Sequence, residues 1–214
     1  MDLLKRKKIK KWSLFIIGSF LIIIGISIIS LKMLLDYQYE KRETKLVDSY
    51  IESTSSKETI VQANDTDAEI PINDLSANEN YLGVLEIPTV NLKNGFYAKE
   101  SPLNTISKNV EILEESDMPN QENGNVILAA HSGTGRYAFF RNLFKLNMGD
   151  YAYIYYQGLK YEYEIVKIEY QEKDGTITIS ELEQDSYLTL TTCDQKDKTK
   201  QIVITAKLSN IKNY

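Results

Sequence analysis

Residues 187–193 read Tyr-Leu-Thr-Leu-Thr-Thr-Cys, a run of aromatic, aliphatic and β-branched side chains. This composition and its alternation are typical of a β-strand, in which successive side chains point to opposite faces. Leu188 and Leu190 share one face, which we expect to lie against a core. Cys193 ends the strand on the other face, with the threonines. A buried and inert cysteine would prefer the leucine face, so this placement favours a functional thiol.

Cys193 and His131 are the only cysteine and the only histidine of the chain. A single cysteine cannot form an internal disulfide, and a nucleophilic thiol needs a base, usually imidazole near neutral pH. His131 ends an apolar run that starts at Gly124, and residues 132–136 after it read Ser-Gly-Thr-Gly-Arg. Loops at strand ends often carry catalytic groups. If the chain performs thiol chemistry, these two residues must perform it.

The N-terminal residues predict a membrane anchor. Residues 1–11 carry six cations and one acid, and residues 12–31 carry no charge. A helix over this uncharged stretch is about 30 Å long, which matches the hydrocarbon core of a bilayer. No small-residue cleavage site follows, so an uncleaved transmembrane helix over 12–35 is favoured over a signal peptide. The positive-inside rule places residues 1–11 in the cytoplasm and the chain that follows the membrane helix outside.

The remainder of the chain predicts a tether and one domain. Residues 36–80 are polar, with a short helix expected at 37–51, and we interpret them as an extracellular tether. The globular domain is expected at 81–214. Removing the six cations and one acid of residues 1–11 from the 25 basic and 30 acidic side chains of the chain leaves a net charge of −10 outside. This charge disfavours nucleic-acid binding, which requires a basic face.

The sequence of the domain predicts an all-β fold. Short apolar or alternating runs bounded by Gly, Pro and Asp predict eight strands and a closed or nearly closed barrel, at 81–87, 91–97, 125–130, 151–156, 160–170, 176–179, 187–193 and 201–208. The apolar parity changes within the fifth run, which predicts a bulge near Ile165. Short helices are expected only near 108–113 and 137–144.

These residues together resemble the sortase family, the cysteine transpeptidases of Gram-positive cell surfaces. Thr-Leu-Thr-Thr-Cys at 189–193 is similar to the T-L-x-T-C signature of that family. The resemblance covers 81–208 and includes a strand that ends in His131, the turn at 146–150 and a final strand that ends at 206–208. The anchor and the tether precede the domain in the order usual for the family.

The resemblance implies an eight-stranded sortase-type β-barrel and a reaction. Cys193 would attack the Thr–Gly carbonyl of an LPXTG-like sorting signal near the C-terminus of a surface protein and form an acyl-thioester. An amine of a peptidoglycan precursor or of a pilin would then resolve the thioester. His131 would donate a proton to the leaving amine and accept one from the incoming amine, a role that suits an imidazole. The enzyme would act at the outer face of the cell membrane.

The family also places an arginine on the strand after the cysteine, where it donates to the substrate carbonyl or oxyanion, and this chain has no arginine there. Counting back from 206–208 puts Gln201 in that position, and a different gap puts Lys200 there. Three interpretations stay open. One of these two side chains substitutes, or Arg136 or Arg141 reaches the site from the preceding loop, or the protein is a weak or specialised member.

Acidic residues on two loops raise the question of a metal. Some sortases bind calcium between comparable loops, whereas solvated acids are the simpler interpretation, and no other cofactor is expected. The acids concerned are Glu114, Glu115, Asp117, Glu172 and Asp174. The segment between 170 and 187 is too short for the long helix of class B, and no aspartate-aromatic lid of class C precedes residue 81. A class A-like or class D-like enzyme remains.

Other classes of protein stay open at this point. Papain-like peptidases place their cysteine before their histidine, the reverse of His131 and Cys193, and L,D-transpeptidases carry their cysteine in a different, glycine-containing motif. A cell-surface cysteine peptidase that hydrolyses without transfer would have the same pair. A non-catalytic surface domain that kept the fold is compatible with the missing arginine.

Overall fold

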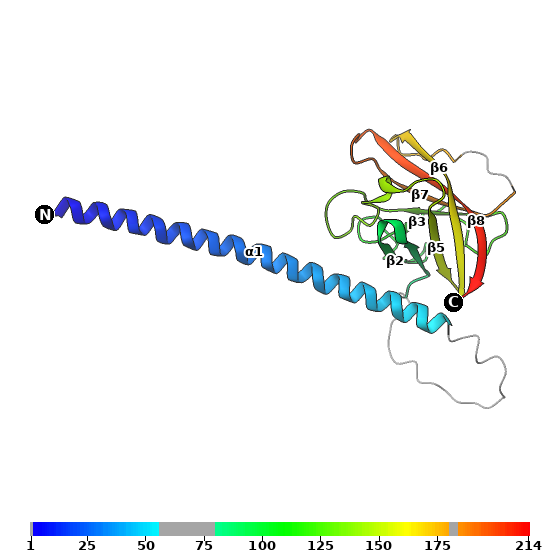
Figure 1. Cartoon of the computed structure of the whole chain (residues 1–214), viewed down its shortest axis with the longest axis horizontal. Coiled ribbons are helices and arrows are strands. Elements are labelled where there is room, and N and C mark those ends of the chain that lie inside the picture. The colour runs from blue at the N-terminus through cyan, green and yellow to red at the C-terminus, as the bar shows by residue number, and fades with distance from the viewer. Residues whose placement is uncertain (1, 56–79, 180–183) are drawn as a thin grey trace, which may run out of the picture. The chain divides into compact units, whose positions relative to one another are not determined.

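A long helix and an eight-stranded sheet make up the described part of the chain. The computed structural model describes residues 2–55, 80–179 and 184–214 (Figure 1). The chain divides into two units, Met1–Arg42 and Glu43–Tyr214, with the boundary inside helix α1 (Asp2–Ser55). Residues 56–79, the larger part of the predicted tether, lie outside the described residues.

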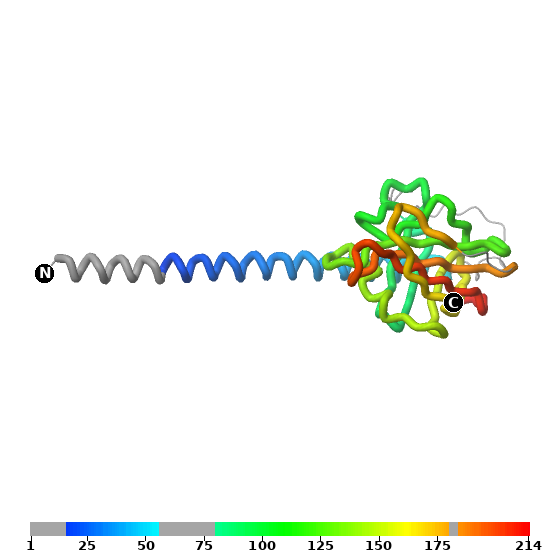
Figure 2. The backbone as a smooth tube through the Cα atoms, turned by 90° about the horizontal axis from the view of Figure 1, so that it is seen from above, coloured from blue at the N-terminus to red at the C-terminus, as the bar shows by residue number. Residues whose placement is uncertain are grey.

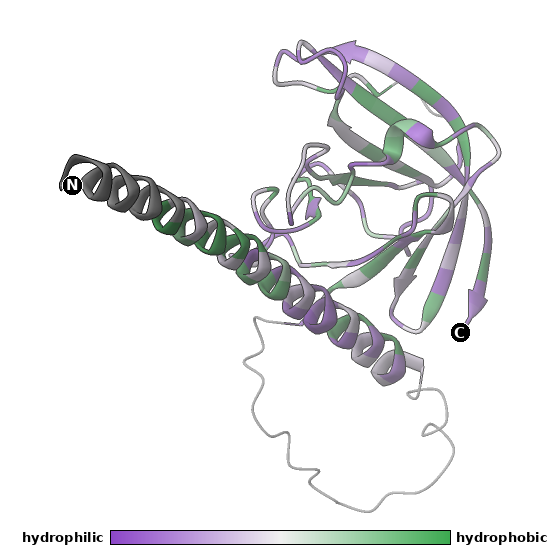
Figure 3. Cartoon of the chain, turned by 60° about the vertical axis from the view of Figure 1, so that its left-hand side comes forward, coloured by the Kyte–Doolittle hydropathy of each residue, from purple (hydrophilic) through white to green (hydrophobic). Residues whose placement is uncertain are grey.

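Helix α1 contains the apolar stretch that the sequence assigns to a membrane. Its part Ile16–Ser55 holds an 18-residue window of mean hydropathy 2.3, none of which is buried. Large apolar side chains there are exposed, among them Ile29 at 69% and Leu31 at 58%, and Figure 3 shows much of the first part of this stretch in green. By length and composition, α1 is the one helix of the described residues that could cross a membrane. The predicted N-terminal span is therefore present as a candidate.

The last turns of α1, residues 43–55, belong to the second unit and pack on the sheet. Val47 is 2% exposed and lies in an apolar cluster with Tyr81, Val84 and Tyr155. The hydroxyl of Tyr50 donates to the carbonyl of Leu82 at 2.7 Å. The helix expected at 37–51 is confirmed, and it extends to Ser55. A helical stretch with one buried apolar face thus occupies the first part of the segment for which we expected a tether.

The described strands form one eight-stranded sheet with the order β2-β1-β5-β6-β8-β7-β4-β3. Neighbouring strands are antiparallel, except that β4 and β7 are parallel. Figure 2 shows the same backbone from above, with the first strands in green and the last in orange and red. The strands are β1 (Gly83–Ile87), β2 (Leu92–Phe96), β3 (Glu111–Ile112), β4 (Asn125–Ala129), β5 (Tyr151–Tyr156), β6 (Leu159–Glu172), β7 (Tyr187–Cys193) and β8 (Lys200–Asn213).

A single bridge closes the sheet into a barrel. Phe96 at the end of β2 pairs in parallel with Val110, next to the start of β3. Beside this bridge the buried Asn94 side chain donates to the side chain of Asn109 at 2.7 Å. Both bridging side chains are fully buried. The predicted closed or nearly closed barrel is therefore confirmed, and its seam joins the two edge strands β2 and β3.

Alternation along the strands builds the core inside this barrel. Leu188 and Leu190 of β7 are fully buried and belong to the main apolar cluster, as do Ile202 and Ile204 of β8. The predicted bulge is confirmed at Val166, because the pairing with β8 passes from Ile165 directly to Lys167. The same cluster includes Leu85, Ile154, Tyr163 and Ala206.

Three local predictions are wrong. Residues 176–179 do not form a strand, and residues 111–112 form the short strand β3 where we expected a helix. The helix expected at 137–144 is reduced to turns and the 3₁₀ helix η3 (Leu143–Lys145), and a second 3₁₀ helix, η2 (Pro88–Val90), follows β1. The described residues therefore form eight strands, as predicted, but β3 takes the place of the strand expected at 176–179.

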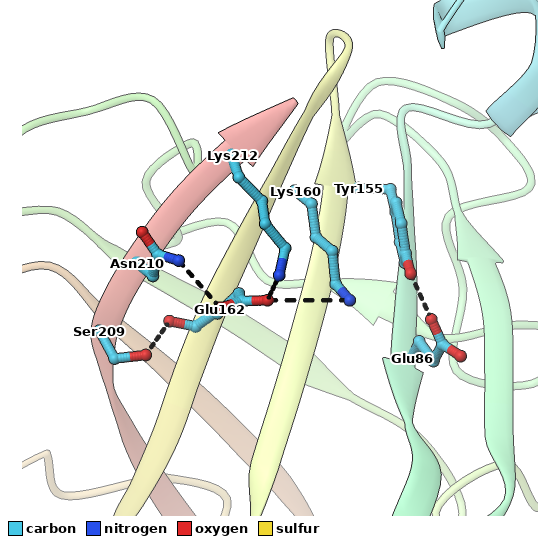
Figure 4. Close-up of polar contacts among 7 residues, drawn as sticks. All are labelled: Glu86, Tyr155, Lys160, Glu162, Ser209, Asn210 and Lys212. Carbon is cyan, nitrogen blue, oxygen red and sulfur yellow. Dashed lines mark hydrogen bonds and ion pairs between the residues drawn. The ribbon is translucent and has the colours of Figure 1, made fainter. Parts of the chain in front are cut away.

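Polar contacts tie the outer face of the barrel at the end farthest along the strands from Cys193 (Figure 4). Glu162 of β6 pairs with Lys212 of β8 at 2.5 Å and with Lys160 at 3.9 Å. The hydrogen bond from Lys212 is the main reason that the pKa of Glu162 is lowered. On the neighbouring strands the hydroxyl of Tyr155 donates to Glu86 at 2.5 Å. These contacts leave the opposite end of β6, β7 and β8 for the candidate site.

Candidate active site

Cys193 is the last residue of β7 and is half-buried. As the alternation predicts, Leu188 and Leu190 lie in the core and the thiol lies on the other face. That face is more covered than we expected, because Thr189 is 0% exposed and Thr191 is 8% exposed. The hydroxyl of Thr189 donates to the side chain of Asn125 on β4 at 3.0 Å. The strand therefore opens to solvent only as it reaches the cysteine.

His131 follows the neighbouring strand β4 and is exposed. The parallel register between β4 and β7 pairs Ala129 with Thr191, so two residues further each chain reaches His131 and Cys193 at the same level. The hydroxyl of Thr192 donates to the carbonyl of Ala130 at 2.7 Å and keeps the two strands together there. The fold thus brings the only imidazole and the only thiol to the ends of adjacent strands.

The loops that follow the two strands are tied to each other. The hydroxyl of Ser132 donates to the carbonyl of Cys193 at 2.5 Å. The side-chain amide of Gln195 donates back to the carbonyl of Ser132 at 2.5 Å and also to the carbonyl of Arg141. Ser132 is buried although it lies in a loop. These reciprocal bonds fix the backbone around the histidine relative to the backbone around the cysteine.

A cleft of about 310 Å³ opens beside His131. Gly135 lies in its wall with a φ of +135°, a conformation that residues with a side chain rarely adopt. Cys193 is not among the lining residues, so the cleft approaches the pair from the side of the histidine. The lining residues are Ser107, His131, Gly133, Thr134, Gly135, Tyr137 and Ala138.

The register places Gln201 directly opposite Cys193 on β8. Directly paired residues of antiparallel strands point to the same face, so Gln201 lies beside the thiol; that it takes the place of the arginine stays a prediction. Its amide nitrogen donates to the backbone carbonyls of Glu172, at 3.3 Å, and of Thr176. Lys200 instead forms an exposed ion pair with Asp197 at 3.9 Å.

The two arginines after His131 have other contacts. The guanidinium of Arg141 donates to the carbonyl of Gly135. Arg136 lies over the ring of Tyr137, 6.0 Å from its centroid. Both arginines therefore take part in the structure of the loop that lines the cleft, and their approach to the thiol stays a prediction.

The acidic residues considered for calcium have separate roles. Asp117 accepts from the backbone N–H of Asn125 at 2.9 Å, which closes the loop before β4. Asp174 accepts from the backbone and the hydroxyl of Thr176, and these hydrogen bonds lower the pKa of Asp174. Within residues 2–55, 80–179 and 184–214, no group of three or more His, Cys, Asp or Glu side chains is arranged to hold a metal ion. The calcium site stays a prediction without support from these contacts.

Sequence reasoning did not find three residues that shape the site. Ser132 and Gln195 connect the two loops, and Gln171 pairs with Gln201 in the next strand across. The parity of β6 could have shown Gln171, since it alternates with the apolar Tyr170. The bonds of Ser132 and Gln195 depend on two loops far apart in sequence, which no local pattern reveals.

Comparison with known proteins agrees with the fold. The sortase domain family model matches residues 85–209. The solved structure of a Clostridium perfringens sortase D5 transpeptidase superposes with a TM-score of 0.56 at 23% identity, over 78% of this chain and 98% of that one. Sortase C of Streptococcus pneumoniae superposes with a TM-score of 0.56 at 19% identity, over 79% of this chain and 95% of that one.

Two curated relatives are similar in sequence. Sortase D of Bacillus subtilis (strain 168) is 32% identical over 111 residues, which are 52% of this chain and 53% of that protein. Sortase A of Bacillus anthracis is 25% identical over 175 residues, 81% of this chain and 76% of that protein. The chain thus spans about half the length of the first relative and three quarters of the second. Because the family model covers more than half of the chain, from β1 into β8, this protein belongs to the sortase family.

Proposed function

We propose that this protein is a membrane-anchored cysteine transpeptidase that cleaves an LPXTG-like C-terminal sorting signal and transfers the surface protein to an amine of the cell wall or of a pilin. The observation that carries the proposal is the position of His131 and Cys193 at the same level of two paired parallel strands. Family membership supports the same reaction class. The exposed apolar stretch of α1 supports anchoring, with residues 1–11 in the cytoplasm.

The reaction takes two steps that regenerate the enzyme. The sulfur of Cys193 bonds to the Thr carbonyl carbon of the signal as the thiol proton passes to His131, and the Thr–Gly bond breaks as His131 gives that proton to the leaving glycine amine. The acceptor amine then attacks the thioester carbonyl. Its proton passes through His131 to the leaving sulfur, so a new amide bond replaces the thioester and the free thiol is restored. Each bond broken is matched by a bond formed, and no cofactor is consumed.

The test uses the full chain in detergent micelles with a fluorogenic LPXTG-type peptide, with and without an added primary amine. We expect cleavage, and ligation when the amine is present, and both should be lost in Cys193→Ala and His131→Ala. Ser209→Ala is the matched control, because Ser209 lies on β8 far along the strand from the site and contacts Glu162. Alkylation with iodoacetamide followed by intact mass measures thiol reactivity separately, since Cys193 is the only cysteine.

The outcomes separate the alternatives. Cleavage that the added amine does not convert to ligation would indicate a peptidase that hydrolyses without transfer. Failure to cleave every sorting-signal variant, together with a Cys193 that resists alkylation, would refute both catalytic functions and leave a surface domain with the sortase fold.

One observation favours a slow member of the family as the second candidate. The amide that stands in the arginine position, that of Gln201, is uncharged and already donates to two backbone carbonyls. Removing one oxyanion donor costs about 10²–10³ in rate in a serine protease. Gln201→Arg supplies further donors at this position, so a rise in kcat in the same assay would support a missing donor. An unchanged kcat would show that this position does not limit the reaction.

A further inference from the structure

A row of three side chains crosses the sheet at the candidate site. Gln171 of β6 pairs directly with Gln201 of β8, and Gln201 pairs directly with Cys193 of β7. Directly paired residues of antiparallel strands point to the same face, so two glutamines and the thiol lie side by side on one surface. All three are partly exposed. What Gln201 binds therefore lies near Cys193, and what Gln171 binds lies one strand further along the row.

Both glutamines bind the backbone of residues 173–179, which we call the site segment. The Gln171 amide donates to the carbonyl of Thr178 at 2.7 Å and its oxygen accepts from the N–H of Thr178 at 2.9 Å. The side chain of Gln171 thus makes the two hydrogen bonds that the backbone of a neighbouring strand residue would otherwise make. The Gln201 amide donates to the carbonyl of Thr176. The site segment has no regular secondary structure of its own, so these side chains replace a ladder.

Further contacts hold the start of the site segment. The N–H of Lys173 donates to the carbonyl of Thr199, just before β8, at 2.7 Å. Asp174 closes a turn by accepting from the N–H of Thr176 at 3.0 Å and from its hydroxyl at 2.7 Å. These bonds fix where the segment starts. Among the described residues, the hydrogen bonds of Gln171 and Gln201 connect its second half, Thr178 and Thr176, to the strands that carry the site.

We propose that Gln171 and Gln201 are positioning residues that hold the site segment beside Cys193, and that Gln201 acts in this way and not as the donor to the substrate oxyanion. An amide nitrogen has two hydrogens, and the nitrogen of Gln201 contacts two backbone carbonyls, those of Glu172 and Thr176. Donation to a substrate would require it to give up one of these contacts. Where the family's arginine would donate to the substrate, we propose that Gln201 instead holds the site segment in place.

The consequence for the reaction rests on the proposed transpeptidase function. We place the peptide of the proposed reaction along the site segment as it reaches Cys193, so the position of the segment would affect substrate binding in the ground state and the transition state alike. Loss of such uniform binding raises KM and leaves kcat nearly unchanged. Loss of an oxyanion donor lowers kcat instead. The split between the two constants distinguishes a positioning residue from a catalytic one.

The experiment compares Gln171→Met and Gln201→Met in the full chain in detergent micelles, with Gln121→Met as control. Methionine has nearly the length of glutamine but cannot donate through an amide. Gln121 is exposed on the connection before β4, away from the row. Hydrogen exchange of residues 173–179 is followed by mass spectrometry without substrate, and KM and kcat are measured with the LPXTG-type peptide. Thermal melting confirms that each variant is folded.

We expect about tenfold faster exchange of the site segment in both glutamine variants, since each lost hydrogen bond changes a local opening equilibrium by roughly 2–10-fold. KM should rise by a similar factor with kcat within about twofold, and the control should match the parent chain. Unchanged exchange in either glutamine variant would overturn the anchoring. A fall in kcat of about 10²-fold with unchanged exchange in Gln201→Met would make Gln201 a catalytic donor. The exchange result needs no turnover, so it decides the anchoring even if no peptide is cleaved.

Discussion

The packing of residues 43–55 against the barrel predicts that Val47→Ala destabilises the second unit. Val47 is 2% exposed and touches the cluster of Tyr81, Val84 and Tyr155, although it lies outside the domain boundary that the sequence suggests. The substitution removes two buried carbon groups, which costs about 1.6 kcal/mol of transfer free energy at about 0.8 kcal/mol each. The cavity adds roughly 1 kcal/mol. The higher helix propensity of alanine returns about 0.5 kcal/mol.

The net loss is about 2 kcal/mol, which lowers Tm by roughly 4–8 °C in a domain of this size. The assay is thermal unfolding of the full chain in detergent micelles, followed by near-ultraviolet circular dichroism of the barrel tyrosines. Val166→Ala is the matched control, because it is the same substitution at a valine that is 42% exposed at the bulge of β6. It should change stability by no more than about 0.5 kcal/mol. Equal Tm values for Val47→Ala and Val166→Ala would refute the docking of the helix on the barrel.

Three more outcomes follow from the contacts around the site. Thr192→Val removes the hydroxyl that donates to the buried carbonyl of Ala130 at 2.7 Å, so denaturant titration should show a free energy of unfolding that is lower by about 1–3 kcal/mol. Hydrogen bonds from Thr176 lower the pKa of Asp174, so the stabilisation from its carboxylate is complete above the unfolded pKa and is lost as pH falls through the folded pKa. Hydrogen exchange at the N–H of Thr176, corrected for intrinsic rates, should therefore become faster on acidification. Asp174→Asn should weaken this pH dependence. Gln195→Met removes two donors between the loops, so kcat in the peptide assay should fall while thiol alkylation persists.

The strands that were predicted well are those whose own sequence carries the pattern. β5 and β7 have the predicted bounds, because each is a full run of aromatic, aliphatic and β-branched residues bounded by turn residues or by the cysteine. The bulge at Val166 was visible because a one-residue insertion reverses the parity of every side chain after it. The same parity rule correctly placed Cys193 off the core face.

The incorrect predictions share one cause: partners outside each segment determined its structure. Thr-Ile-Thr-Ile at 176–179 has the composition of a strand, but side chains of Gln171 and Gln201 take the backbone groups that a ladder would use. β3 has two residues and exists because β4 offers it partners and the bridge at Val110 closes the barrel. The helix at 43–55 buries one apolar face within a segment whose polar composition suggested a spacer. Each was decided by partners outside the segment itself, seven residues away for Gln171 and Thr178 and farther away in the other cases.

The site itself follows the same division between what is local and what is not. Cys193 and His131 were singled out because each is the only residue of its kind in the chain and each lies at or just after the end of a recognisable strand. Their meeting depends on the one parallel pair among the described strands, β4 with β7, since an antiparallel pair would have sent the two strand ends to opposite ends of the barrel. The neighbour of the thiol on the next strand depends on the register of β7 with β8, which pairs Gln201 with Cys193. Gln201 in turn binds Thr176, so a substitution of Gln201 also affects the site segment that we propose to lie beside Cys193. The effect of such a substitution on KM can therefore differ from its effect on kcat.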